Sequence, residues 1–208
     1  MRFDLHVHSA YSHDSFLRVD TIVKLAKKRN LQGVAVVDHN ATRGGFEALK
    51  VNSDPDFTIV VGAEIRTDYG DVIGLFLNED VRSRQLEEVL EEIRVQGGLS
   101  VLAHPYRQYA FPEEIAAKMD ALEGFNARSR KQDNERAYQL ALKYKKPITS
   151  GSDVHLGCEI GKGVTIVDCD VEDALKKGKT QVEGRESRYY LVHGMSVATE
   201  RLRRLTRG

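Results

Sequence analysis

The chain has 208 residues, enough for one well-buried core and short for two. Its 31 basic and 31 acidic residues cancel, which argues against a broad charged surface for long nucleic acid or anionic membranes. No apolar run approaches the roughly 20 residues that span a bilayer, and the N-terminus lacks the apolar segment of a secretory signal. We therefore expect a cytoplasmic protein that binds no membrane and forms no stable complex with long nucleic acid. Its two cysteines, Cys158 and Cys169, form no C-x-x-C pair and are expected to be reduced, buried thiols.

Short apolar runs alternate with amphipathic stretches along the whole chain. In chain order, strands are predicted at residues 3–7, 33–37, 58–65, 71–77, 99–103, 121–125, 147–149 and 163–167. Several of these runs are continuously apolar, which is typical of strands covered on both faces, as in parallel sheets. Apolar residues at helical spacing predict helices at 20–29, 84–96, 134–144 and 171–177.

This alternation predicts a single α/β domain over residues 1–208, built from repeated strand–helix units. A complete eight-unit barrel takes about 250 residues, so a reduced or distorted barrel is expected here. A doubly wound sheet is the alternative.

Metal-ligating side chains recur where predicted strands end. His6 and His8 are two positions apart at the end of the first strand, so their rings share one face. The same residue types end four further apolar runs: His39, Glu64, His104, and the pair Asp153 and His155. A single histidine beside a strand is more often a hydrogen-bonded structural residue. Five of seven histidines at strand ends instead indicate a metal site at the active edge of a parallel barrel.

The two remaining histidines differ. His13 adjoins Asp14 and could replace it as a ligand, whereas His193 has no ligand-type neighbour and is expected to be structural.

These residues form a set that resembles the PHP (polymerase and histidinol phosphatase) family of metal-dependent phosphoesterases. Residues 4–9, Asp-Leu-His-Val-His-Ser, with Ser-His-Asp at 12–14, look like its first motif. Residues 37–39, 102–105 and 151–155 resemble the next three, and Glu64 stands where the family has a metal-bridging glutamate. The resemblance implies a distorted (βα)7 barrel of the TIM-like type.

The resemblance also implies a division of the ligands among two or three divalent ions, manganese, zinc or iron. One ion would be held by His6, His8, Glu64 and Asp153, and a second by Glu64 as bridge with His104. A third would be held by Asp14, His39 and His155. Asn126 stands where many members have another histidine, and a neutral amide oxygen there would weaken the second site.

The implied activity is hydrolysis of a phosphomonoester of a small metabolite or nucleotide through a metal-activated water, with Glu64 and Asp153 as catalytic ligands. Phosphate recognition calls for a forked cation, and Arg107 and Arg128 are favoured because each lies within three residues of a proposed ligand. Arg43, Arg130 and Lys131 are weaker options.

Several alternatives stay open from sequence. An exonuclease acting on short nucleic-acid ends is disfavoured by the neutral charge and the lack of an obvious aromatic platform. A non-catalytic domain would require lost ligands, and an amidohydrolase is disfavoured by the motif at 151–155. Asp38 could orient His39 or cap a turn, and the basic run 201–207 is expected to be the solvated face of a helix.

Overall fold

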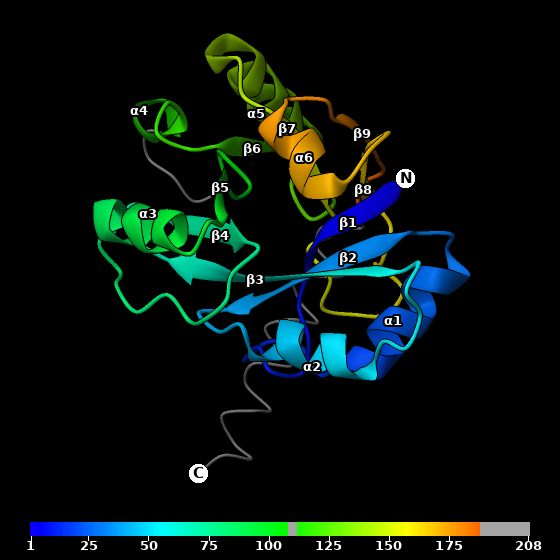
Figure 1. Ribbon diagram of the computed structural model, residues 1–208. Helices are drawn as coiled ribbons and strands as arrows, with labels where there is room; N and C mark the ends of the chain where they lie inside the picture. The colour runs from blue at the N-terminus through cyan, green and yellow to red at the C-terminus, as the bar shows by residue number, and fades with distance from the viewer. Residues whose placement is uncertain (108–111, 188–208) are drawn as a thin grey trace.

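The computed structural model describes residues 1–107 and 112–187. Within them nine strands form one sheet in the order β7-β6-β5-β4-β3-β2-β1-β8-β9, curled into a barrel (Figure 1). The strands are β1 (Arg2–Val7), β2 (Gly33–His39), β3 (Thr58–Arg66), β4 (Asp71–Leu75), β5 (Leu99–Leu102), β6 (Ala121–Asn126), β7 (Ile148–Gly151), β8 (Gly163–Ile166) and β9 (Gln181–Gly184).

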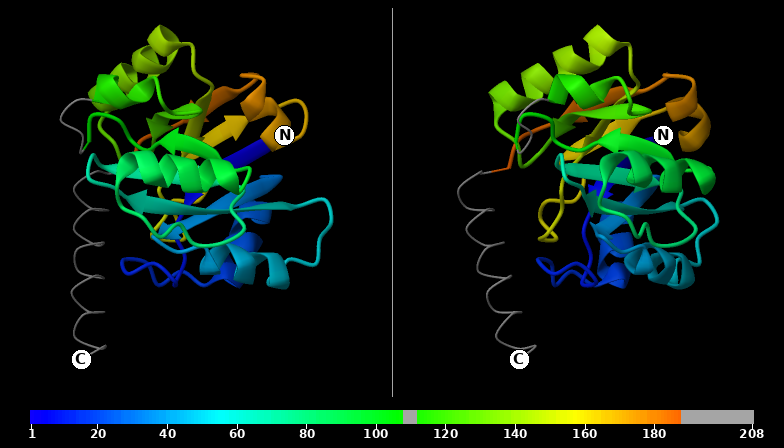
Figure 2. Two further views of the ribbon diagram at one scale, coloured as in Figure 1. Left: turned by 60° about the vertical axis from the view of Figure 1, so that its left-hand side comes forward. Right: turned by 90° about the vertical axis from the view of Figure 1, so that its left-hand side faces the viewer.

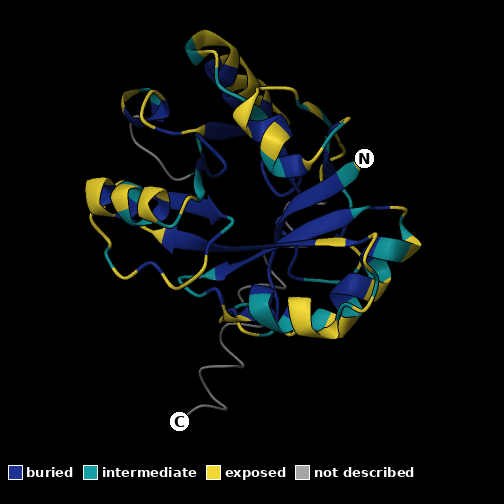
Figure 3. Cartoon of the chain, in the orientation of Figure 1, coloured by how far each residue is buried: buried dark blue, intermediate teal, exposed yellow. Residues whose placement is uncertain are grey.

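Helices lie around the outside of this barrel with one side buried and the other exposed (Figures 1 and 3). They are α1 (Val19–Lys28), α2 (Arg43–Val51), α3 (Leu86–Val95), α4 (Pro112–Ala116), α5 (Lys131–Tyr144) and α6 (Val171–Lys176). Ile22 and Ala26 of α1 pack in one buried apolar cluster with Val34 and Val36 of β2. Of these elements, α2, α4 and β9 were not predicted. Helix α2 contains Gly44 and Gly45, which disfavour helix, α4 has only five residues, and β9 is mostly exposed.

The sheet is mixed rather than wholly parallel. Strands β1–β2–β3 and β5–β6–β7 are parallel, but β4 pairs antiparallel with both β3 and β5. Strand β8 is likewise antiparallel to β1 and β9. The continuous apolar runs arise because helices and the barrel interior cover both faces of these strands, whatever their direction.

The barrel closes between β7 and β8 without a regular ladder (Figure 2). The hydroxyl of Thr165 accepts from the backbone N–H of Ser150 and donates to the Ser150 carbonyl. A Cβ on Gly163 would lie 2.2 Å from the Gly151 carbonyl oxygen, so glycine is needed for this approach. The distorted TIM-like barrel is thus confirmed, and the doubly wound sheet is not observed.

A second closure lies at the carboxyl edge of the barrel. Val154, just past β7, forms an isolated parallel bridge with Val7 of β1. The His8 N–H donates to the Val154 carbonyl, and the Val154 N–H donates to the His6 carbonyl. The bridge therefore brings the histidines of β1 beside Asp153 and His155, which flank Val154.

A β-bulge in β1 decides which way His6 points. Asp4 pairs with Val34 and Val7 with Val36, so Leu5 and His6 together lie opposite the single residue between those valines. Because side chains alternate along a regular strand, His6 would otherwise share a face with Asp4. The extra residue instead places His6, together with His8, on the face opposite Asp4, as bulges beside active sites commonly re-aim side chains.

The remaining expectations concern the cysteines, membrane spans, the C-terminal residues, domain number and compartment. Both cysteines are free thiols, but the expectation that they are buried is wrong, because Cys158 is exposed and Cys169 is partly exposed. In residues 1–107 and 112–187 no helix is long and apolar enough to cross a membrane. His193 and the basic run 201–207 lie outside the described residues, and the single-domain and cytoplasmic assignments stay predictions.

Candidate metal centre

The inner group comprises His6, His8, Glu64, His104 and Asp153, each at most 3% exposed. The Nε2 atoms of His6 and His8 are 3.1 Å apart, and Glu64 Oε2 lies 3.5 and 3.2 Å from them. Asp153 Oδ1 is 3.8 and 3.6 Å from the same two nitrogens. On the far side, Glu64 Oε1 lies 2.7 Å from His104 Nε2. Glu64 thus faces both predicted inner ions.

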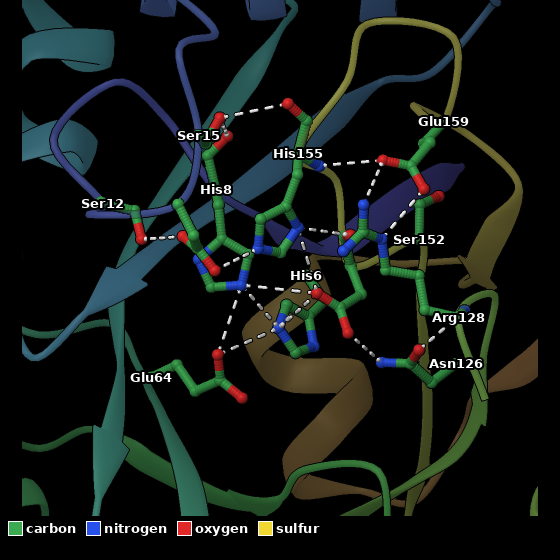
Figure 4. Close-up of polar contacts among 12 residues, drawn as sticks. His6, His8, Ser12, Ser15, Glu64, Asn126, Arg128, Ser152, His155 and Glu159 are labelled. Atoms are coloured by element: carbon green, nitrogen blue, oxygen red, sulfur yellow. Dashed lines mark hydrogen bonds and ion pairs between the residues drawn. The ribbon is translucent and has the colours of Figure 1, made fainter. Parts of the chain in front are cut away.

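The outer group comprises Asp14, His39 and His155. Asp14 Oδ2 lies 3.2 Å from His39 Nε2 and 2.5 Å from His155 Nε2. His155 Nδ1 bonds to the Asp153 carbonyl, which directs Nε2 at Asp14. His8 also lies within reach of this group, because its ring stacks 4.6 Å from that of His39. Figure 4 shows His8 and His155 side by side.

Two ligands have unusual backbone geometry. His104 and Asp153 have φ angles of 30° and 54°, a left-handed conformation that costs energy in residues with side chains. Each is held in place: His104 N–H donates to Glu123 Oε2, and Asp153 lies between the backbone of β7 and the Val154 bridge. Such strain, where surrounding structure enforces it, is typical of functional sites.

The charges at the centre are strongly coupled. Burial lowers the pKa of His6 and His8, but neighbouring carboxylates outweigh it, raising the pKa of His6 well above normal and that of His8 to about 10. Burial raises the pKa of Glu64, yet the imidazoles His39, His6 and His104 bring it well below its usual value. The pKa of Asp153 is lowered likewise, by Arg107 and His6 against burial.

The residues present fit divalent cations. Imidazole nitrogens and carboxylate oxygens from well-separated parts of the chain converge to within 4.8 Å in overlapping groups. The Nδ1 atoms of His8 and His104 are buried with no hydrogen-bond partner among the described residues. Manganese, zinc and iron all accept such a mixed nitrogen and oxygen set.

Glu123 supports the inner group and was not identified from sequence. Its Oε1 lies 2.9 Å from His6 Nδ1, so a carboxylate orients this imidazole from behind. Its Oε2 accepts from the His104 N–H and from the Asn126 amide at 3.0 Å. A charged residue inside an otherwise apolar predicted strand was the available signal.

Arg107 lies at the centre, as predicted. Its Nη2 donates to Asp153 Oδ2 at 2.7 Å, and its side chain is 16% exposed. Asn126 also lies there, but its Oδ1 accepts from the Arg128 N–H at 2.9 Å, while its Nδ2 faces Asp153 and Glu123. The amide therefore presents nitrogen, not oxygen, to the ligands, and its role as a ligand is not supported.

Arg128 is placed differently from expectation. Its guanidinium donates from Nε and Nη2 to the two oxygens of Glu159, at 2.9 and 3.1 Å, and both side chains are buried (Figure 4). Glu159 also accepts from the backbone N–H groups of His155 and Leu156. Arg128 thus braces the loop that carries His155, and its predicted role in binding phosphate stays a prediction.

Other candidates fall outside the ligand groups. Arg43 lies 5.0 Å from the ring centroid of Tyr11, and Lys131 lies near Glu135 on the exposed face of α5. His13 stacks 4.7 Å from His39 but belongs to no ligand group, whereas Asp14 does. Asp38 accepts from the N–H and hydroxyl of Ser9, so it orients the loop after His8.

Known proteins supply a family for this geometry. The PHP-associated family matches residues 131–180. The chain is 40% identical over 141 residues to uncharacterized protein MJ1587 of Methanocaldococcus jannaschii, covering 61% of this chain and 82% of that protein. Uncharacterized protein MJ0417 of the same organism is 33% identical over 173 residues, covering 77% of this chain and 68% of that protein. The chain belongs to the PHP family.

Solved structures share the fold of this PHP chain. A two-domain protein of Bacteroides vulgatus, containing a predicted PHP-like metal-dependent phosphoesterase, matches with a TM-score of 0.75 and 17% identity, over 89% of this chain and 65% of that one. PsfC of Pseudomonas syringae matches with a TM-score of 0.70 and 17% identity, over 97% and 98%. At these identities the likeness is one of fold. In this chain, histidine and carboxylate side chains occupy the positions that would bind metal ions. The protein is a metal-dependent hydrolase.

Proposed function

We propose that this PHP protein is a metal-dependent phosphoesterase that hydrolyses a phosphomonoester of a small metabolite or nucleotide. The observation that carries the proposal is Arg107, whose guanidinium adjoins Asp153 at the wall of the inner group. A forked cation beside clustered cation ligands matches the oxygens of a terminal phosphate.

The protein's own residues divide the work. His6, His8, Asp153 and Glu64 would hold the inner ions, with Glu123 fixing the ring of His6. When bound, divalent ions acidify water and neutralise phosphate oxygens. Arg107 would turn its remaining N–H donors to the substrate while its contact with Asp153 fixes the side chain in place.

The monoester is favoured over a diester by charge. A terminal phosphate carries up to two negative charges at one end, which a single fork and nearby cations can match. A long nucleic acid needs many phosphate contacts along its backbone, whereas the chain has a formal net charge of zero.

The test is phosphate release from a panel of phosphorylated metabolites and nucleotides, with manganese supplied. We expect kcat/KM for the best monoester to fall by roughly 10²-fold in Arg107→Ala, about 2.7 kcal/mol of transition-state stabilisation. Arg107→Lys should recover only part, because lysine supplies charge without the fork.

The matched control is Arg43→Ala, which removes an arginine that lies against Tyr11 rather than Asp153. Its kcat/KM should stay close to the wild-type value. Faster cleavage of internal phosphodiesters than of any monoester would overturn the proposal in favour of a nuclease. Full activity of Arg107→Ala would remove Arg107 from it.

A further inference from the structure

Asp71 lies at the carboxyl edge of the barrel although it begins a strand. Strand β4 lies between β3 and β5 and runs antiparallel to both. Its first residue therefore lies where its neighbours end. Asp71 pairs with Arg66 across the β3–β4 hairpin, two residues from Glu64, and its carbonyl accepts from the N–H of Ala103, next to His104.

This position puts Asp71 beside two proposed ligands of the second ion. Glu64, Asp71 and His104 each offer one ligand atom, and these atoms lie within 4.8 Å of one another. All three residues are at most 2% exposed. The His104 ring points into the group, with Nε2 2.7 Å from Glu64 Oε1, and its Nδ1 is buried without a hydrogen-bond partner among the described residues.

The alternative third ligand, Asn126, presents the wrong atom. Its amide oxygen accepts from the Arg128 backbone N–H, a donor that cannot turn away. Flipping the amide would place its NH₂ against that N–H and forfeit the hydrogen bonds to Glu123 and Asp153. The hydrogen-bond network therefore fixes the amide with its oxygen away from the ligands.

We propose that Asp71 is the third protein ligand of the ion shared by Glu64 and His104. A carboxylate on β4 would take the place of the imidazole that the family resemblance implies at position 126, at the end of β6. The inference rests on the metal centre of the proposed function but not on its substrate.

The simpler reading is that Asp71 only pairs with Arg66, whose Nε lies 2.6 Å from Asp71 Oδ1. The two partners differ in burial, since the Arg66 side chain is 57% exposed and the Asp71 side chain is 2% exposed. An exposed arginine is strongly solvated and offsets little of the cost of burying a carboxylate beside the second buried carboxylate of Glu64. A divalent ion between the two carboxylates would offset that cost directly.

The experiment measures Mn²⁺ binding to metal-free full-length protein by calorimetry, with metal content per chain from elemental analysis. Asp71→Asn keeps the shape of the side chain and removes its charge. We expect the affinity for one ion to fall tenfold or more while the remaining ions bind as in wild type. Asp71→Glu should recover part of the loss.

Arg66→Gln is the matched control, because it breaks the same ion pair and leaves the carboxylate in place. Its Mn²⁺ affinity should equal or exceed the wild-type value. Equal Mn²⁺ affinity in Asp71→Asn and wild type would overturn the proposal, as would equal losses in Asp71→Asn and Arg66→Gln.

A third measurement needs no variant, should Asp71→Asn fail to fold. Anomalous diffraction from wild-type crystals grown with Mn²⁺ should place an ion in direct contact with Asp71, Glu64 and His104. An ion bound to Asn126 instead of Asp71 would refute the assignment. Mn²⁺ binding through Asp71 without hydrolysis of any phosphoester would overturn the proposed function and leave this inference standing.

Discussion

The inner and outer groups of the metal centre are built in different ways. The inner ligands lie on strands or directly at their ends and are almost completely buried. In the outer group only His39 belongs to a strand, and the Asp14 and His39 side chains are 14% and 17% exposed. Strand ladders and the bulge in β1 therefore position the inner ligands, whereas the outer ligands depend on hydrogen bonds within loops.

Several side-chain hydrogen bonds hold the loops that carry Asp14 and His155. Ser12 Oγ donates to Asp14 Oδ1 at 2.7 Å, and Ser15 Oγ lies within hydrogen-bond distance of the His8 and His155 carbonyls (Figure 4). Glu159, held by Arg128, accepts from the His155 N–H. The comparison predicts that substitutions in these loops weaken ion binding at the outer group and leave the inner group unchanged.

The largest effect should come from removing two inner ligands. The double substitution His6→Ala and His8→Ala should weaken binding of the ion that these two histidines share by roughly 10³-fold or more. Each ligand contributes several kcal/mol of metal affinity. The barrel should stay folded, because the apolar residues of β1 are unchanged. Elemental analysis and circular dichroism check both points, and wild-type metal content in the double variant would refute the ligand assignment.

Glu159 and Glu123 offer a paired test of the two groups. Glu159→Gln should weaken the outer ion by about 10-fold to 100-fold, the usual effect of removing a residue that orients a metal ligand. Glu123→Gln should do the same to an inner ion. Mn²⁺ titrations that show both substitutions affecting the same ion would break the distinction between the groups.

The substitution Arg128→Met tests whether Arg128 supports the His155 loop or contacts the phosphate of the substrate. It leaves Glu159 with its two backbone N–H donors, so outer-ion affinity should fall less than in Glu159→Gln, by roughly fivefold. KM for a monoester should stay near the wild-type value. A raised KM with unchanged metal affinity would return Arg128 to the role of phosphate clamp.

The smallest effect should come from Ser9→Ala. The substitution removes the hydroxyl that donates to Asp38 and keeps the Ser9 N–H bond to the same carboxylate. Loss of one hydrogen bond costs about 1 kcal/mol, and only part of this should reach the outer ion, so its affinity should drop by less than roughly fivefold. Thermal unfolding of the metal-free variant, compared with wild type, would separate this change from a general loss of stability.

Chelation gives the same comparison without substitution. On dialysis against a mild chelator the outer ion should leave first, because its ligands are the more exposed. Metal content followed over time would show one ion lost early and the rest later. Early loss of the ion next to His104 would instead indicate a weak second site, as an Asn126 ligand would produce.

The sequence alone indicated eight of the nine strands, the candidate ligand residues and the family. Strand ends were readable because apolar runs are continuous, and a histidine or carboxylate directly after such a run must lie at the carboxyl edge when neighbouring strands are parallel. The side chains that this rule selected, His39, Glu64, His104, Asp153 and His155, fall in overlapping groups at that edge.

Tertiary structure decided what the rule could not cover. Asp71 was missed because β4 runs antiparallel, so its first residue, not its last, reaches the active edge. The bulge that turns His6 inwards depends on register with β2, which no local pattern encodes. Arg107 and Arg128 looked equivalent in sequence, and only the fold shows that Arg128 pairs with the buried carboxylate of Glu159, 31 residues away, whereas Arg107 pairs with Asp153.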